Sequence, residues 1–478
     1  MNKFQISFYF FFLLVFLTKA QDSTEGYQLL KYTQEFPERY FKKIDETASR
    51  LASDQIILKN EEALEIYKNS LTGVKKLFEM GNILHEGEIY DYVNELLHDL
   101  YNDDPEILKD INLYVTKLSA PNAFTTPDGT ILINTGLISI LDYREELMFI
   151  IAHEVGHYIK SHALKSKKES NQLEERSFDT EEDKILYLKL SHSREFESES
   201  DAYAISKLTS LSRFNVDKST NALSKLEFQN TSLEEVPTSF YNLIKSDEFI
   251  PDSSNIFVTN EFEELNKIEI NDNQSVFRGD VDNYSTHPAI TKRIVAIKEI
   301  LKYSDYELNE KAKATEKEEI KFQKIKMASF FETANHAFES GKYILAFNYA
   351  SYLLNLYPEN KFVLNLMNKS LYWISYYKEI NDLDNEADEI PIFFRSMYWL
   401  TAKYFKEISS SDLKKLAFFT VSKYQDKMKN DDTFNFYLVL HAENYLGKEA
   451  SSIFMTNYKK NFPKGKYTKL INRKLSGT

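Results

Sequence analysis

His153-Glu154-Val155-Gly156-His157 carries two histidines four residues apart, with a glutamate directly after the first. On an α-helix, side chains at positions i and i+4 lie on the same face, so both imidazoles can reach one metal ion. The glutamate between them can take a proton from water at the open coordination position. The chain has 9 histidines and 73 acidic residues, and a random order of its residues would give only roughly 0.03 such matches. The spacing therefore predicts a helix that carries a catalytic zinc site.

The third zinc ligand must come from elsewhere, because catalytic zinc usually takes three protein ligands and leaves one position to water. His162 would point away from the ligand face if the helix continued, since each residue turns a helix by about 100°. Residues 193–202 are more suitable, and spacing alone does not choose between their two pairs of acidic residues four apart, Glu197 with Asp201 and Glu195 with Glu199. In either pair, one carboxylate can bind zinc while the other holds the second ring N–H of a ligand histidine.

These motifs resemble the zinc metallopeptidase family that includes HtpX, the CAAX prenyl proteases and BepA. Its pattern after the zinc helix, Arg-x-x-Glu-x-x-(Ala)-Asp, is matched by Arg194, Glu197 and Asp201. Residues 121–138 resemble the strand and turn before the zinc helix, and residues 285–294 resemble the closing Thr-His-Pro…Arg-Ile signature. The resemblance covers residues 81–301. It implies that Glu197 is the third ligand of one zinc ion and that Asp201 supports the site.

Two positions depart from the family pattern. Asp128 stands where glycine is common, which alters a turn, and Ser200 stands where alanine is usual. We expect neither to affect zinc binding. The resemblance also implies that an extended peptide adds as a strand to a sheet edge beside the metal.

The role of His287, in the closing signature, has three open interpretations. Its imidazolium could stabilise the oxyanion of the tetrahedral intermediate. It could instead occupy the fourth zinc position and keep the enzyme latent, as related exported proteins suggest. The third interpretation is a helix-starting residue without a catalytic part.

The first twenty residues have the pattern of a Sec signal peptide. A basic start at Lys3 precedes an apolar run over residues 6–17, and Thr18 and Ala20 are small residues at positions −3 and −1 of a cleavage site. We therefore expect export to the periplasm or the extracellular space. No later run is long enough to span a membrane, so the mature chain is expected to have no transmembrane segment.

Composition narrows the function further. The chain has no cysteine, which excludes disulfides and lipidation of an N-terminal cysteine. Its net charge of −14 argues against nucleic acid as a partner. Hydrophobic residues make up 42% of the chain, enough for more than one core.

The periodicity of apolar residues predicts a mainly α protein with a small β-sheet. Alternation of apolar and polar residues predicts a strand at residues 112–118, residues 130–134 read as a second strand, and turns are expected between them. The zinc helix is expected from Asp142, as N-cap, to about Lys160. The polar residues 165–184 read as a connection, and residues 245–282 as an irregular stretch.

The C-terminal third has a different pattern, typical of a tetratricopeptide repeat. Small and aromatic residues recur over residues 334–360, and a weaker copy follows at residues 437–463. We therefore predict a gluzincin-type α+β peptidase domain and an α-helical repeat domain. The expected segments are a signal peptide (1–20), an N-terminal helical segment (21–80), the peptidase domain (81–305) and the repeat domain (320–478).

The sequence therefore predicts an exported zinc metalloendopeptidase that cleaves unfolded or misassembled envelope proteins. Zinc would be bound by His153, His157 and Glu197, with Glu154, Asp201 and His287 as the other site residues. The alternative is a chaperone or assembly factor for outer-membrane proteins. Its repeats would bind clients or the assembly machinery.

Overall fold

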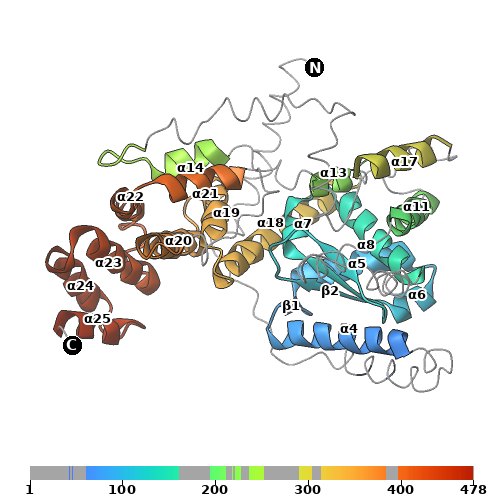
Figure 1. Ribbon diagram of the computed structural model, residues 1–478, viewed down its shortest axis with the longest axis horizontal. Coiled ribbons are helices and arrows are strands. Elements are labelled where there is room, and N and C mark those ends of the chain that lie inside the picture. Colours follow the sequence, from blue (N-terminus) through green and yellow to red (C-terminus); the bar gives the residue numbers. More distant parts are fainter. Residues whose placement is uncertain are drawn as a thin grey trace, which may run out of the picture. The chain divides into compact units, whose positions relative to one another are not determined.

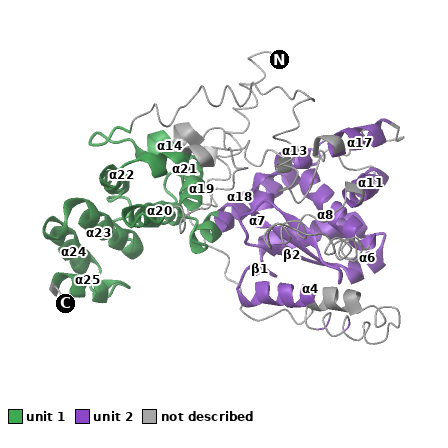
Figure 2. Cartoon of the chain, in the orientation of Figure 1, with its two compact units in different colours: residues 1–29, 230–269, 334–478 green, residues 30–229, 270–333 purple. Residues whose placement is uncertain are grey.

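The computed structural model describes residues 42, 46, 61–160, 194–211, 218, 221–227, 236–251, 290–303, 314–383 and 397–476. The chain folds into two compact units (Figure 2). Unit 2 comprises residues 30–229 and 270–333, and unit 1 comprises residues 1–29, 230–269 and 334–478. The expected signal peptide and His287 lie outside the described residues.

Unit 2 is built around a four-stranded sheet with the strand order β1-β2-β4-β3. Strand β2 (Asn112–Thr116) pairs in parallel with β4 (Thr130–Asn134), so the two strands expected from the sequence are confirmed. Two antiparallel edge strands flank them: β1 (Ile83–Leu84) beside β2, and β3 (Ala123–Thr125) beside β4. These edge strands are only two and three residues long, too short for alternation to reveal.

Helices cover both faces of this sheet, which explains why every residue of β2 and β4 is buried. On one face, helix α4 (Glu61–Glu79) packs Val74 and Phe78 against Tyr114 and Leu132. Figure 1 shows α4 on one side of the sheet and helix α8 (Arg144–Ile159) on the other. The sheet thus forms a rigid support under α8, the helix with the two histidines.

Helix α8 is buried on all sides from Arg144 to His157, as expected of a helix at the centre of a domain rather than on its surface. The other helices of unit 2 are α5 (Glu88–Tyr101), α6 (Pro105–Asp110), α7 (Thr135–Ile140), α11 (Arg194–Ser210), α13 (Asn221–Glu227), α17 (Ile290–Tyr303) and the first part of α18 (Glu316–Glu339). Of these, α5, α11 and α13 contact α8, and α17 contacts α11.

The start of α8 differs from the expectation that Asp142 is its N-cap. The N-cap is Tyr143, and no side chain caps the helix there. Glu146 instead reaches back and accepts a hydrogen bond from the Asp142 backbone N–H at 2.8 Å. The Asp142 carboxylate is occupied by ion pairs with Lys225 (2.6 Å) and Lys326 (2.8 Å). The Glu146 carboxylate and the ion pairs of Asp142 with later helices, rather than an Asp142 cap, therefore fix this end of α8.

The regular secondary structure in the described part of unit 1 is all helical. Its helices are α14 (Val236–Ile244), the end of α18, α19 (Tyr343–Leu356), α20 (Lys361–Glu379), α21 (Met397–Glu407), α22 (Ser410–Ser422), α23 (Asp432–Leu446), α24 (Lys448–Asn461) and α25 (Thr468–Ser476). Consecutive helices pack together, among them α19 with α20 and α23 with α24. The C-terminal helical region is therefore present, while its assignment to a repeat family stays a prediction.

Helix α14 joins unit 1 although its sequence lies about a hundred residues before the rest of that unit. Its Phe240 is 1% exposed and makes edge-to-face contacts with Phe347, Tyr404 and Phe405. Lys423 donates hydrogen bonds to the carbonyls of Leu243 and Lys245 at the end of α14. Among the helices that the structure describes, none is long and apolar enough to cross a membrane.

Candidate metal centre

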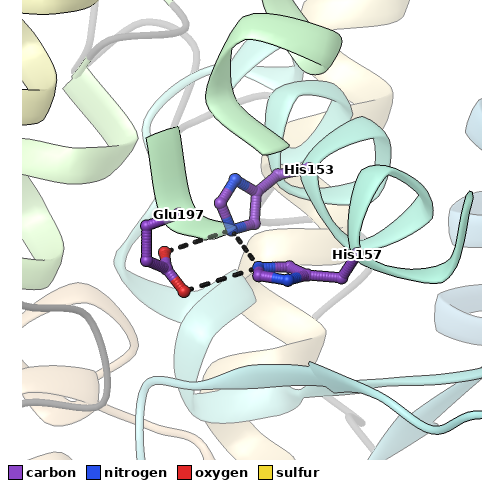
Figure 3. A group of neighbouring side chains, drawn as sticks. All are labelled: His153, His157 and Glu197. Atoms are coloured by element: carbon purple, nitrogen blue, oxygen red, sulfur yellow. Dashed lines mark hydrogen bonds and ion pairs between the residues drawn. The ribbon is translucent and has the colours of Figure 1, made fainter. Parts of the chain in front are cut away.

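The structure brings three potential ligand side chains together inside unit 2 (Figure 3). His153 and His157 project from one face of α8, and Glu197 projects toward them from α11. Glu197 is fully buried, and the two histidines are 4% and 5% exposed. Their ligand atoms form the one group in the described part of the chain with the composition and spacing of a metal site.

The distances between these atoms fit a tetrahedral ion. The two histidine Nε2 atoms are 3.0 Å apart, His157 Nε2 is 3.4 Å from Glu197 Oε1, and His153 Nε2 is 3.5 Å from Glu197 Oε2. Zinc bonds of about 2.0–2.1 Å in tetrahedral geometry place neighbouring ligand atoms about 3.3 Å apart. The separations, two of which run to different oxygens of Glu197, are close to this value, so the three side chains suit a zinc ion.

The orientation of His153 is fixed by Asp201. Asp201 Oδ1 lies 2.9 Å from His153 Nδ1, on the far side of the ring from Glu197. A carboxylate at this nitrogen fixes the tautomer that presents Nε2 to a metal. Asp201 lies four residues after Glu197 on α11, so one helix supplies both a candidate ligand, Glu197, and the group that orients His153.

Arg293, on α17, joins the two carboxylates. Its Nε and Nη2 atoms donate to Asp201 at 2.7 and 2.8 Å, and its Nη1 atom lies 2.8 Å from Glu197 Oε2. The guanidinium is 6% exposed. Two buried carboxylates so close together need a compensating positive charge. Arg293 supplies that charge from a third helix.

These charges set the protonation of the site. Burial alone would lower the pKa of His153, but hydrogen bonds and charges from Asp201 and Glu197 outweigh it and raise that pKa to about 9. Burial raises the pKa of Asp201, but Arg293 and His153 hold it below its ordinary value. In the metal-free protein, His153 therefore carries a proton at neutral pH. A metal ion has to displace that proton.

Glu154 lies beside the ligands and contacts the sheet. Its Oε2 atom accepts a hydrogen bond from the Thr125 hydroxyl at 2.6 Å. The same hydroxyl lies 2.9 Å from the backbone carbonyl oxygen of Glu154. Glu154 is 3% exposed, so its carboxylate is held largely away from bulk water, on the residue directly after the candidate ligand His153.

Gly156 allows α8 and α11 to approach closely enough for this geometry. A Cβ atom at this position would lie 3.1 Å from a ring carbon of Tyr203 and 3.2 Å from the Cα of Ser200. Both contacts are tighter than ordinary side-chain packing. The middle glycine of the motif thus has a packing reason, and the small side chain of Ser200 faces it across the helix pair.

The predicted turn residue Asp128 has a structural role. Its carboxylate accepts hydrogen bonds from the hydroxyls of Thr126 at 2.6 Å and Thr130 at 2.7 Å. Gly129 follows with a φ of +82°, a conformation that suits glycine. Asp128 thus ties together the hairpin between β3 and β4.

Most of the predicted site residues lie in the described part of the chain. His153, His157 and Glu197 form the metal group, with Asp201 and Glu154 around it, whereas His287 and His162 fall outside the described residues. Sequence reasoning gave Arg293 no role and did not single out Thr125. A basic partner such as Arg293 could have been expected, because two acidic residues buried at one site require a compensating positive charge. Thr125 lies in a strand too short to be recognised.

Comparison with known proteins supports this picture. Residues 88–178 match Peptidase family M48, and no curated protein matches the chain. The matched residues include α5, strands β2 to β4 and all of α8 with both histidines. Glu197 lies beyond the match, and the structure brings it to the histidines. Over residues 88–178, the chain is thus similar to Peptidase family M48, whose members are metalloproteases, which indicates a metallopeptidase.

Proposed function

We propose that the protein is a zinc-dependent metalloendopeptidase. One observation carries the proposal: His153, His157 and Glu197 bring their ligand atoms within 4.8 Å of one another, and both histidines, with Glu154 between them, lie on a helix within the segment that matches Peptidase family M48. Two imidazoles and one carboxylate are a donor set typical of catalytic zinc.

His153, His157 and Glu197 would hold the metal. Bound there, zinc supplies Lewis acidity that polarises the peptide carbonyl and acidifies water. Glu154 takes a proton from the attacking water and later gives it to the leaving amine nitrogen, so the carboxylate is regenerated. Asp201 keeps the His153 ring in place, and Arg293 balances the charge of the two carboxylates on α11.

The natural substrates are proposed to be unfolded or misassembled proteins of the cell envelope. The signal-peptide pattern of residues 1–20 supports export. Among the strands that the structure describes, β3 lies at an edge of the sheet next to β4, and it contacts α8 beside Glu154. Such an edge can bind an extended peptide as an added strand, which requires an unfolded segment.

A second function is favoured by the aromatic side chains of unit 1. Tyr343 stacks on Trp373 and Tyr377, and Tyr376 beside them is 40% exposed. Partly exposed aromatic groups of this kind suit protein binding. An assembly factor acting through unit 1 would keep its cellular function in a Glu154→Gln variant, whereas a peptidase would lose it.

The first test compares the parent protein with Glu154→Gln on unfolded casein, after both are loaded with zinc. The substitution removes the proton acceptor and keeps the size of the side chain. We expect cleavage to fall at least about 100-fold with zinc content unchanged. Equal cleavage by the two proteins would contradict the role of Glu154. Absence of cleavage in both, with zinc bound, would favour the assembly-factor function.

A further inference from the structure

Strand β3 places Thr125 against the helix that carries the metal ligands. Thr125 lies opposite Ile131 on β4, and its neighbour Phe124 lies opposite Leu132. Leu132 and Phe124 belong to the cluster formed with α4, so Thr125 must project from the other face of the sheet. That face is covered by α8, where the Thr125 hydroxyl contacts Glu154.

Both contacts of the Thr125 hydroxyl are with one residue. Its oxygen is 2.6 Å from Glu154 Oε2 and 2.9 Å from the carbonyl oxygen of Glu154. A hydroxyl has one proton to donate, and the shorter distance assigns it to the carboxylate. Hydrogen bonds to an ionised group are short and about twice as strong as neutral ones. The strand therefore fixes the carboxylate of Glu154 through Oε2.

We propose that Thr125 is a positioning residue that holds Oε2 of Glu154 and leaves Oε1 as the oxygen that accepts the proton of water. This inference rests on the proposed peptidase function. In the step it serves, an O–H bond of water breaks, an O–H bond forms at Oε1, and the water oxygen bonds to the peptide carbon while the π electrons of the carbonyl move to its oxygen. The proton then passes from Oε1 to the amine nitrogen as the C–N bond breaks and the C=O double bond re-forms. Throughout, Thr125 keeps its bond to Oε2.

A purely structural role would give a different result on substitution. If Thr125 only joined β3 to α8, its loss would weaken the fold or peptide binding and would raise KM. A positioning role predicts a loss in kcat, because the misplaced carboxylate affects only the chemical step. A serine at this position would preserve the hydroxyl and therefore the function.

The test uses the zinc-loaded full chain with Thr125→Val, which keeps the shape and removes the hydroxyl, and Thr125→Ser as its matched control. We expect kcat on an unfolded peptide substrate to fall about 10-fold or more in Thr125→Val, with KM within about 2-fold of the parent. Thr125→Ser should retain most of the parental kcat. Zinc content should be equal in all three proteins.

A second measurement does not depend on activity. Crystal structures of the metal-free variants should show the Glu154 carboxylate moved away from β3 in Thr125→Val and kept in place in Thr125→Ser. Thr125→Ala serves as a second hydroxyl-free variant if valine prevents folding. An unchanged kcat in Thr125→Val, or equal losses in the serine and valine variants, would overturn the inference. If the parent itself shows no Glu154-dependent cleavage, the peptidase function fails, and the inference falls with it.

Discussion

Two buried histidines, one in each unit, show how differently the two regions are stabilised. His153 in unit 2 is 4% exposed and His441 in unit 1 is 2% exposed. Burial lowers the pKa of both, but Asp201 and Glu197 reverse this effect at His153 and raise its pKa to about 9. At His441, only the carbonyl of Asn368, at 3.1 Å, opposes burial, and the pKa falls to about 4. Charged neighbours, rather than depth, decide which buried histidine carries a proton.

The cores of the two units differ in the same way, one containing charged groups and the other aromatic rings. Around His153, unit 2 buries two carboxylates and the Arg293 guanidinium, connected by hydrogen bonds and ion pairs. In unit 1, the core around Phe240 consists of aromatic rings in edge-to-face contact. Burying these charged groups costs desolvation energy, and buried charged clusters of this kind are found preferentially at functional sites. The aromatic core needs no such explanation.

Among the changes that test this difference between the two units, Arg293→Met is expected to have the largest effect on stability. The substitution leaves Glu197 and Asp201 buried without their counter-charge, so the free energy of unfolding of metal-free protein should fall by about 3–5 kcal/mol. Zinc brings positive charge to Glu197 and should recover part of the loss. The measurement is urea unfolding, followed by far-ultraviolet circular dichroism, with and without zinc.

Arg144→Met is the matched control. Arg144 belongs to the same unit and pairs with Glu318 at 2.5 Å, but the Glu318 side chain is 40% exposed and can be solvated when its partner is lost. A smaller loss, independent of zinc, is expected there. If Arg293→Met were destabilised equally with and without zinc, the view of Arg293 as counter-charge to the metal ligands would be wrong.

A smaller effect is expected from pH: as pH falls, the stability contributed by His441 decreases, whereas the stability contributed by His153 increases. The pKa of His441 is about 4 in the folded protein, whereas the ordinary histidine value of 6.5 applies to the unfolded chain. As pH falls from 6.5 to 4, the unfolded chain binds a proton that the folded chain does not, so unit 1 should lose on the order of 3 kcal/mol of stability. Above pH 6.5 this contribution is fully present.

His153 acts in a separate pH range. Its raised pKa stabilises metal-free unit 2 below pH 6.5, and this contribution is lost as pH rises toward 9. Both tryptophans, Trp373 and Trp399, belong to unit 1, so their fluorescence during urea unfolding follows unit 1, which contains His441 and not His153. His441→Gln keeps an N–H donor for Asn368 and should remove the pH dependence between 4 and 6.5. An unchanged slope in this variant would refute the assignment.

Parts of the fold could be predicted from the sequence where local signals were strong. Strands β2 and β4 lie where the sequence predicted strands, and the predicted end of α8 near Lys160 is confirmed. The edge strands were missed because they are very short. The N-cap at Asp142 was wrong because its carboxylate pairs with Lys225 and Lys326, which are distant in sequence. The packing of α14 in unit 1 is likewise a long-range association that local periodicity does not encode.

The candidate site shows the same limit. The i, i+4 spacing placed His153 and His157 on one face, but Glu197 could be separated from Glu195 and Glu199 only through the family resemblance. Arg293 and Thr125 come from other elements, and their contacts with Asp201 and Glu154 depend on how α17 and β3 pack. Motif spacing therefore predicted the chemistry, whereas the groups that hold the reacting residues in place required the structure.

The most direct test of the central claim is the zinc content of the purified chain beside Glu197→Ala, measured after zinc loading and removal of free metal. The geometry predicts one zinc per chain in the parent, held by His153, His157 and Glu197. It predicts loss of most of that zinc in Glu197→Ala, because two imidazoles alone bind zinc weakly. Equal zinc in both proteins, or none in the parent, would contradict the assignment of this metal centre.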